Sequence, residues 1–403
     1  MIPKPFLREV ASTPLEILKR KCKNVSVRDF DLILKSVHEC FKPAKKRKRR
    51  DTVGWFAKVL KVSRRKSREI LLSHDERYEL GCERIARQVE SWLQDDSLEI
   101  QKVTTFQRID PGSRKVRTIA RLNIKQLVLD HVAVTALEEL SKRIGYAQVS
   151  SIKGRGAHYG KHLIQSWIVN SRCRMYYTKL DIKDFYGSTD RGHLMKWLKA
   201  RVANKPLLTL IRKLIFSSPS GLPIGSFLSQ TLANIYLSDI FHFAKEQCKY
   251  RKGVNQVDHV LMYMDDIVLI GSNKRQLKYA VEKIIQFVKD KLHLTIKPNW
   301  NVRQLTERHP LDMMGFRFYK DGYTNLRKRI FKYVRRSLVR AKNKHLELHQ
   351  ARRMMSYKGY ADYTAIKSVL MRLSAVNSFQ RAISLISNHD ILQSHIFAGA
   401  DPC

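Results

Sequence analysis

Apolar residues recur every three to four positions through much of the first hundred residues, a spacing that predicts amphipathic helices. FDLILKSVHECF (30–41) and ERIARQVESWL (83–93) both show it. From about residue 100 the pattern is mixed, because VTTFQRIDPGSRKVRTIARL predicts two short strands around a Pro111–Gly112 turn. A helical pattern from Asn123 to Lys142 follows. The first part of the chain is therefore expected to be mostly helical, with one short pair of strands.

Residues 175 to 320 combine strand-like and helical patterns. Three strand-like runs, MYYTKLDI, VLMYMDDIVLI and MMGFRFY, are separated by amphipathic helical stretches. Such interleaving indicates an α/β or α+β domain. After residue 325 the pattern becomes helical and strongly basic, and RKRIFKYVRRSLVRAKNKH holds nine Lys or Arg and no acid. The chain has no internal repeat and no long Gly/Ser linker. Its 403 residues exceed the usual size of a single core, so two or three subdomains are expected.

The charge balance changes this picture by pointing to a partner. The chain has 403 residues, 43% of them hydrophobic, which is enough for a substantial core. Its 77 Lys and Arg outnumber 36 Asp and Glu, for a net charge of +41. A field of this sign and size implies a polyanionic partner, most often nucleic acid. The run KKRKRR (45–50) is the densest part, and it fits a phosphate-binding loop better than a nuclear address.

Cysteine usage and the N-terminal residues indicate a compartment. The six cysteines are scattered without CxxC spacing, which argues against a zinc site or a disulfide framework and fits a reducing cytoplasm. MIPKPFLREV has no signal-peptide core, and no run of 18 apolar residues occurs that could span a membrane. The expectation is a soluble cytoplasmic protein without a membrane partner.

The candidate chemistry lies in LMYMDDIVLIG (261–271), where Asp265 and Asp266 interrupt a run of apolar residues. Period-two alternation on both sides predicts a hairpin with the aspartates at its tip. An ordinary Asp-Asp turn is the alternative. Upstream, Asp181 ends the strand-like run in KLDIKDFYGS. If the two strands are neighbours, three carboxylates meet, and such a cluster suits two Mg²⁺ ions, about 4 Å apart, that would clamp the oxygens of a phosphoryl transfer.

A third segment, GLPIGSFLSQTLANIYLSDI, lies between these two acidic sites. Gly221, Pro223 and Gly225 predict a flexible turn, and a helix is expected from Ser229 to Asp239. A glycine-rich turn of this kind lets a backbone approach a template base and sugar closely. The order is distinctive: Asp181, the Gly-Pro turn about 40 residues later, and the Asp pair about 40 residues beyond that.

These three segments together resemble motifs A, B and C of reverse transcriptases. The resemblance extends over roughly residues 100 to 400 and implies an α+β right-hand polymerase fold with fingers, a palm with an antiparallel sheet, and a helical thumb. The boundaries it implies are a basic helical N-terminal extension at 1–100, fingers at 101–174, the palm at 175–322 and a basic helical thumb at 323–403. It leaves the function of the first hundred residues unexplained.

The resemblance also implies roles for individual residues. It implies that Asp181, Asp265 and Asp266 are the catalytic and metal-binding residues, and that the backbone of Ile182 is a further metal ligand. It also implies that two Mg²⁺ ions bind and that Mn²⁺ can replace them. GSRKVRTIAR resembles the fingers strand that holds the triphosphate, and SSIKGRGAH (Lys153 to Gly156) is similar to the segment between fingers and palm in group II-intron-like enzymes. The deoxynucleoside triphosphate (dNTP) site would comprise Lys115, Arg117, Arg121, Tyr186, Gly225 and Gln230. MMGFRFY looks like the primer grip, through Gly315 and Phe316. RNA binding is expected at Lys45, Lys46, Arg47, Lys48, Arg49, Arg50, Arg335, Arg336 and Arg340.

Two positions decide finer chemistry. Tyr186, five residues after the first aspartate, would lie beneath the ribose, where its ring would collide with a 2′-hydroxyl and favour DNA synthesis. A core tyrosine is the alternative. Relatives place a lysine after the proline of LxLxPxK as a proton donor to pyrophosphate. Here LTIKPNWN has Trp300 at that place, so Lys297 is only a candidate general acid, and another donor is the alternative.

The lineage is narrowed by motif B. Its text from Ile224 to Gln230, IGSFLSQ, is similar to that of diversity-generating retroelement and defence-associated "unknown group" reverse transcriptases of bacteria, whereas group II intron enzymes usually read QGxxxSP. DFYGSTD and the long basic N-terminal region depart from the diversity-generating type. The VTG-containing recognition segment of retrons is not seen near the expected thumb, which makes a retron enzyme less expected. No endonuclease-like stretch is visible, which argues against autonomous retrotransposition. Antiphage defence is the preferred role, and diversification is the runner-up.

The expected partners follow from these assignments. They are a structured noncoding RNA template, the DNA product and dNTPs, with an accessory protein or a homo-oligomer as further options. Two alternatives stay open: template-independent or protein-primed synthesis, with Tyr357, Tyr360 or Tyr363 as primer, and a catalytically dead RNA-binding scaffold. The presence of all three aspartates and Tyr186 speaks against the scaffold.

Overall fold

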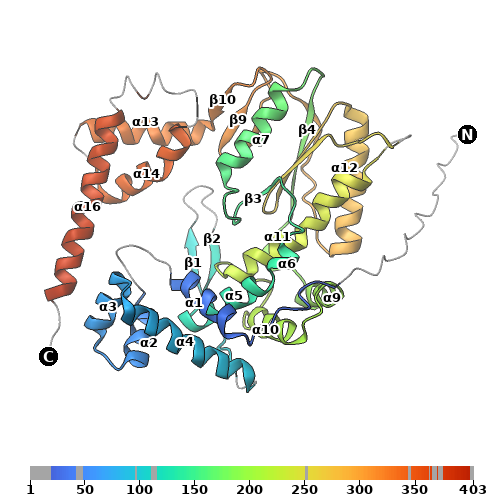
Figure 1. The fold of residues 1–403 in the computed structure, drawn as a ribbon. Coiled ribbons are helices and arrows are strands. Elements are labelled where there is room, and N and C mark those ends of the chain that lie inside the picture. The colour runs from blue at the N-terminus through green and yellow to red at the C-terminus, as the bar shows by residue number, and fades with distance from the viewer. Residues whose placement is uncertain are drawn as a thin grey trace, which may run out of the picture. The chain divides into compact units, whose positions relative to one another are not determined.

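The computed structural model describes residues 20–41, 49–95, 98–109, 116–249, 253–343, 346–362, 364, 370 and 375–399 (Figure 1). The chain divides into two compact units, each assembled from separated segments. The first unit takes Met1–Ala44, Lys48–Arg143 and Tyr186–Gln230, and the second takes Lys45–Arg47, Ile144–Phe185 and Thr231–Cys403. This division does not test the boundaries expected for the fingers, palm and thumb at residues 100, 174 and 322, which stay predictions.

The first unit is mainly helical, as the pattern predicts. Its four leading helices are α1 (Phe30–Phe41), α2 (Arg50–Leu60), α3 (Arg64–Ser73) and α4 (Glu76–Gln94). They are followed by the hairpin β1 (Thr104–Ile109) and β2 (Val116–Arg121), and by α5 (Ile124–Ala136) and α6 (Glu138–Ser141). The later segment adds α8 (Phe185–Ser188), α9 (Arg191–Arg201) and α10 (Lys205–Phe216). Helix α1 packs on both α4 and α5, so the N-terminal helices share a core with the rest of the unit.

Local sequence explains where α5 begins. Asn123 caps the helix by accepting a hydrogen bond from the Gln126 amide, and the Gln126 side chain returns a bond to the Asn123 amide. This reciprocal capping box confirms the predicted helix start. The single helix predicted to reach Lys142 is instead divided at Leu137 into α5 and α6.

The second unit is built on a five-stranded sheet with the order β3-β5-β6-β4-β7. Its strands are β3 (Gln148–Val149), β4 (Tyr176–Asp181), β5 (His259–Tyr263), β6 (Asp266–Gly271) and β7 (Arg303–Gln304). All neighbours are antiparallel except β3 and β5. The helices that accompany this sheet are α7 (Ala157–Val169), α11 (Phe227–His242), which begins in the first unit and continues as a short π-helix, and α12 (Lys274–Leu292). The predicted α+β class is confirmed.

A small second sheet and three more helices complete this unit. Strands β8 (Leu311–Met313), β9 (Phe316–Phe318) and β10 (Thr324–Leu326) form the sheet β10-β9-β8. The run MMGFRFY therefore contains a tight hairpin turn: Met314 and Gly315 both have positive φ, as a two-residue turn between twisted strands requires. The helices are α13 (Lys328–Lys342), α14 (Leu348–Asp362) and α16 (Ala375–Gly399), as the helical pattern after residue 325 predicts.

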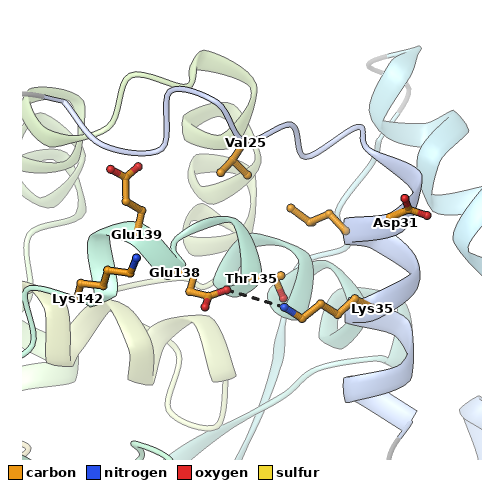
Figure 2. A pocket seen from close by; sticks show the side chains of 8 residues that line it. Val25, Asp31, Lys35, Thr135, Glu138, Glu139 and Lys142 are labelled. Atoms are coloured by element: carbon orange, nitrogen blue, oxygen red, sulfur yellow. Dashed lines mark ion pairs between the residues drawn. The ribbon is translucent and has the colours of Figure 1, made fainter.

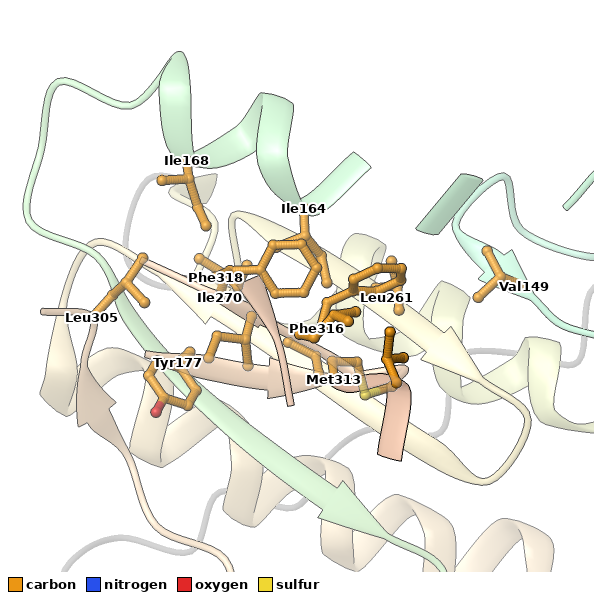
Figure 3. Close-up of a cluster of buried hydrophobic side chains, with 14 of the residues drawn as sticks. Val149, Ile164, Ile168, Tyr177, Leu261, Ile270, Leu305, Met313, Phe316 and Phe318 are labelled. Atoms are coloured by element: carbon orange, nitrogen blue, oxygen red, sulfur yellow. The ribbon is translucent and has the colours of Figure 1, made fainter. Parts of the chain in front are cut away.

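A large apolar cluster joins the two sheets of this unit to α7 and α13. Figure 3 shows Tyr177 of β4, Ile270 of β6 and Phe316 and Phe318 of β9 pointing into it. Burial of so many aliphatic and aromatic side chains stabilises the sheet chiefly through the hydrophobic effect, at about 25 cal/mol per Å² of apolar surface. The strands that carry the acidic residues are thus held in a rigid core. None of the helices in the described ranges has the length and apolarity needed to cross a membrane.

Candidate functional site

The register of β4 against β6 brings two of the predicted catalytic aspartates face to face. Asp181, the last residue of β4, is the Cα partner of Asp266, the first residue of β6. Directly opposed residues of antiparallel strands project to the same side, with Cβ atoms about 4.5–5.5 Å apart. On this face the pair Tyr177 and Ile270 is buried in the apolar cluster, so the face changes from apolar to acidic along four residues.

Asp265 lies beside this pair, in the two-residue turn between β5 and β6. The predicted hairpin is confirmed, with Met264 and Asp265 as the turn and Asp266 already in the strand. Met264 has φ of 55°. A non-glycine residue in this region carries a local cost of about 1–2 kcal/mol, so the packed strands hold the turn in a conformation it would not adopt alone. The Ile182 amide donates to the Asp265 carbonyl oxygen at 3.4 Å, which ties the two acidic segments together.

The electrostatics of this acidic face are those of a site that attracts cations. Burial raises the pKa of the Asp266 carboxyl above its ordinary value, and the charge of Asp181 raises it further. The cations that act against this rise are Lys179, Arg327 and Lys297. Two opposed carboxylates repel each other unless positive charge lies between or beside them.

Lys297 supplies part of that charge directly. Its Nζ atom lies 2.7 Å from Oδ2 of Asp181, and the two side chains are 32% and 40% exposed. The backbone supports the pair, since the Lys297 amide donates to the Asp181 carbonyl oxygen at 2.9 Å. The sequence left Lys297 as one candidate proton donor beside another, unidentified donor, and the structure places it as a counter-charge in contact with Asp181.

The donor set fits a hard divalent cation. Asp181, Asp265 and Asp266 offer carboxylate oxygens from two adjacent strands and their turn, and Mg²⁺ and Mn²⁺ prefer such ligands. Within the described ranges, however, no three His, Cys, Asp or Glu side chains are gathered closely enough to form a ready metal cage. The acidic pair therefore has the ligand chemistry for such a cation, and Lys297 supplies part of the positive charge that the pair requires.

The first unit contains most of the residues predicted to bind the nucleotide. Leu222 donates its amide to the Tyr186 carbonyl oxygen at 2.8 Å. Gly221, with φ of 50°, lies so close that a Cβ atom there would be 2.1 Å from the same oxygen. Glycine is therefore required at this position. The predicted Gly-Pro turn is the element that fixes the backbone of Tyr186.

The same turn is joined to strand β2. The Ala120 amide donates to the Ile224 carbonyl oxygen at 2.8 Å, and a Cβ atom on Gly225 would be 3.2 Å from the Ala120 carbonyl oxygen. Gly225 has φ of 107°, which only glycine adopts without strain. Gln230 follows on α11, where its amide donates to the Ser226 carbonyl oxygen.

Arg117 and Arg121 lie on one face of the β1–β2 hairpin. Arg117 is the Cα partner of Arg108, a basic residue that the sequence reading missed. The Arg121 guanidinium lies 5.3 Å from the centre of the Phe106 ring. The predicted residue Lys115 lies outside the described residues.

Asp130 is a residue of this unit that the sequence reading missed. It lies on α5, is 1% exposed, and accepts a hydrogen bond of 2.6 Å from the Ser226 hydroxyl. It also accepts from the Leu228 amide at 3.4 Å, so the carboxylate caps the beginning of α11 behind the Gly-Pro turn. Burial raises the pKa of Asp130 to about 6. A lone acid in the apolar helix LVLDHVAV was the available signal.

The predicted primer-grip residues occupy the β8–β9 hairpin. Gly315 forms its turn, and the Arg327 amide donates to the Gly315 carbonyl oxygen at 2.8 Å. The Phe316 side chain is fully buried in the apolar cluster, so it packs in the core and only its backbone can face a ligand. The nearby Arg327 side chain donates to Asp312 at 2.8 Å.

The predicted RNA-binding residues divide into two groups. Arg335, Arg336 and Arg340 are exposed on α13 and available to phosphates. Arg49 instead donates to Asp51 and to the Leu122 carbonyl oxygen, at 2.8 and 2.7 Å, which gives it a structural role. Arg50 is exposed at the start of α2. Lys45, Lys46, Arg47 and Lys48 lie outside the described residues.

Figure 2 shows a pocket of the first unit, with a volume of about 430 Å³, lined by residues of α1, α5 and α6. Its charges are largely balanced, since Lys35 lies 3.9 Å from Glu138 and Lys21 lies 3.6 Å from Glu139. Exposed pairs of this kind contribute little to stability and make no catalytic constellation.

A comparison with protein-family models agrees with this geometry. A family model described as "Reverse transcriptase (RNA-dependent DNA polymerase)" matches residues 100–318, more than half of the 403 residues. Among solved structures, the chain is similar to telomerase from Candida albicans in complex with a TWJ fragment of telomeric RNA, at 12% identity and a TM-score of 0.41. That match covers 74% of this chain, which spans 63% of the telomerase chain. No curated protein matches the sequence.

Proposed function

The chain belongs to the reverse transcriptase family, and we propose that it copies an RNA template into DNA by nucleotidyl transfer. Family membership confirms the predicted right-hand polymerase fold. The observation that carries the proposal is the register of Asp181 against Asp266, with Asp265 in the adjoining turn. Three carboxylates at one end of a rigid sheet are the ligands that such a reaction needs.

Reverse transcriptase domains use divalent metal ions, and the proposal assigns two Mg²⁺ here, held by Asp181, Asp265, Asp266 and the backbone of Ile182. When bound, such ions supply charge that stabilises the attacking and leaving oxygens. The chain's own contribution is to hold the carboxylates in register, with Lys297 beside Asp181. Lys297 is the candidate proton donor to the pyrophosphate.

The sugar preference is assigned to Tyr186. Its backbone is fixed by the Leu222 amide, and Gly221 allows the close approach. Held in this way, the ring would lie beneath the ribose and exclude a 2′-hydroxyl. Arg117 and Arg121 on β2, joined to the same turn through Ala120, would bind the triphosphate.

The partners and the biological role extend the proposal. A dedicated structured noncoding RNA is the template, held by phosphate contacts such as those of Arg335, Arg336 and Arg340. The net charge of +41 supports a polyanionic partner. Antiphage defence in bacteria is the role we favour, from the IGSFLSQ text of motif B, and retroelement diversification with an accessory protein is the second candidate.

A primer-extension assay tests the activity. Purified protein, an RNA template with an annealed DNA primer, labelled dNTPs and Mg²⁺ should give extended DNA. The Asp265→Ala/Asp266→Ala variant should give none while unfolding at the same temperature as wild type. Equal extension by the variant, or no extension by wild type with either Mg²⁺ or Mn²⁺, would contradict the proposal and favour an RNA-binding scaffold. Extension without primer or template would favour the template-independent alternative.

A second assay tests the sugar preference. Tyr186→Ala should increase ribonucleotide incorporation by about tenfold or more, because one steric exclusion is worth about 1–3 kcal/mol. Tyr186→Phe is the matched control, since it keeps the ring and should keep the preference. Unchanged selectivity in Tyr186→Ala would remove the assignment.

A further inference from the structure

Helices α2 and α3 form a helix-turn-helix unit that the polymerase fold does not use. Three residues, Lys61 to Ser63, connect them. Lys61 ends α2 in the left-handed conformation, with φ of 56° and ψ of 46°. Ser63 caps α3 by accepting a hydrogen bond from the Lys66 amide at 3.2 Å. A left-handed C-cap followed at once by a new N-cap fixes the direction in which α3 leaves α2.

Buried contacts make this unit rigid. The Ser67 hydroxyl donates to the Val53 carbonyl oxygen at 2.8 Å, which joins α3 to α2. Phe56 of α2 is fully buried and stacks on Tyr78 of α4, with ring centres 5.9 Å apart. A Cβ atom on Gly81 would lie 2.4 Å from the Phe56 ring, so glycine allows α4 to pack directly against α2. Helix α3 is thus held by two neighbours in a fixed orientation.

The outward face of α3 is strongly basic. Only Ser67, Ile70 and Leu71 of this helix are buried. Residues 52–68 include six Lys or Arg and no acid. Lys66 pairs with Glu69 at 3.0 Å, but no ion pair of Arg64 or Arg68 occurs among the residues that the structure describes, and both side chains are exposed. Two arginines near the beginning of the helix therefore face solvent.

We propose that α3 binds B-form duplex DNA by entering its major groove. In helix-turn-helix proteins the second helix lies in this groove with its N-terminal residues on the base edges, while the first helix crosses the phosphate backbone. Arg64 and Arg68 occupy those N-terminal positions. Lys58 near the end of α2 and Lys61 in the turn are both exposed, and they would contact the phosphates. The guanidinium group suits guanine O6 and N7, which it can contact through two hydrogen bonds.

The geometry selects duplex DNA over duplex RNA. The major groove of A-form RNA is too deep and narrow for a helix, whereas that of B-form DNA, about 12 Å wide, admits one. A merely solvated basic face would not require the three-residue turn, the paired caps and the close contact at Gly81. This second site would hold duplex DNA beside the proposed polymerase activity, and it does not depend on that activity.

Two matched double variants of the full-length protein test the site. Arg64→Ala/Arg68→Ala removes two exposed charges from α3, and Lys196→Ala/Lys199→Ala removes two exposed charges from α9 of the same unit. Affinity is measured by fluorescence anisotropy for a DNA duplex of about two helical turns and for an RNA duplex of the same sequence, over a range of salt. Thermal unfolding verifies that both variants remain folded.

The α3 variant should bind the DNA duplex about tenfold or more weakly, because it loses the arginine contacts with guanine O6 and N7. The slope of log affinity against log salt should stay close to that of wild type, since that slope counts phosphate contacts, which the proposal assigns to Lys58 and Lys61. The affinity of the α3 variant for the RNA duplex should change by less than about twofold, and the α9 variant should lose equally little on both duplexes. Wild type should also protect guanine N7 from methylation by dimethyl sulfate, and the α3 variant should not. Equal losses for the two variants, equal losses on the two duplexes, or unprotected N7 would overturn the proposal.

Discussion

Two buried carboxylates, one in each unit, show how surroundings decide what an acid does. Burial raises the pKa of both Asp130 and Asp266. Asp130 receives hydrogen bonds from Ser226 and Leu228, and none of the causes of its pKa shift is a charged neighbour. Asp266 instead faces a second carboxylate, Asp181, and lies in the field of cations.

The difference separates a structural acid from one that is proposed to be catalytic. A buried carboxylate whose lone pairs are satisfied by protein donors has no capacity left for a ligand, so it stabilises the elements that it joins. Opposed carboxylates at a strand end instead repel each other and require positive charge, part of which Lys297 supplies. Asp130 thus positions the turn before α11, and the chemistry is proposed for Asp181, Asp265 and Asp266.

The largest expected effect comes from removing charge at the proposed catalytic aspartates. Asp181→Asn keeps the size of the side chain but loses the charge that is proposed to hold a divalent cation, so we expect DNA synthesis to fall by about 10²–10³-fold or more. Asp130→Asn is the control, and its rate should stay within about threefold of wild type. Primer extension measures both. Comparable rates for the two variants would remove the contrast between the sites.

The free energy of unfolding should depend on Asp130, although the rate of DNA synthesis should not. Asp130→Ala leaves the Ser226 hydroxyl and the Leu228 amide without their buried acceptor, and we expect the free energy of unfolding to fall by about 2–4 kcal/mol. Asp130→Asn keeps an acceptor and should lose less than about 1 kcal/mol. Denaturant unfolding compares the two. A small loss in Asp130→Ala would mean that the junction is not important for stability.

The pH dependence of stability gives an independent measurement of Asp130. Its pKa is about 6 in the folded protein against 3.8 for the ordinary side chain. Between these values the folded state retains a proton that the unfolded state has released. The contribution of Asp130 to the free energy of unfolding is therefore largest below about pH 4. This contribution falls by up to about 3 kcal/mol as the pH rises from about 4 through 6.

Unfolding of wild type and Asp130→Asn at several pH values between 4 and 8 isolates this contribution. The stability difference between the two proteins should shift in favour of the variant as the pH rises. A difference that stays constant across the range would show that Asp130 does not titrate as its burial requires.

The smallest effect on stability is expected at the ion pair between Lys297 and Asp181. Lys297 and Asp181 are both partly exposed, so Lys297→Met should change the free energy of unfolding by less than about 1 kcal/mol. DNA synthesis should nevertheless fall, by about 10²-fold, because the proposed proton donor to pyrophosphate is lost. Lys297→Arg, the matched control, keeps the charge. A large stability loss with unchanged synthesis would make Lys297 a structural residue like Asp130.

The sequence by itself determined the elements and the chemistry that they can carry. Period-two alternation around Asp265 and Asp266 predicts the hairpin, and the helical pattern from Asn123 predicts the start of α5, because both kinds of periodicity depend on neighbours a few residues apart. The family motifs could be found for the same reason, since each is a short continuous text.

Only the tertiary structure decided which of these residues meet. The pairing of Asp181 with Asp266, the contact of Lys297 with Asp181, and the burial of Asp130 against Ser226 join residues that are 85, 116 and 96 positions apart. The exposed arginine face of α3 likewise follows from which side α2 and α4 cover. Register and burial depend on how distant segments pack around a common core, and no local pattern in the chain records that packing.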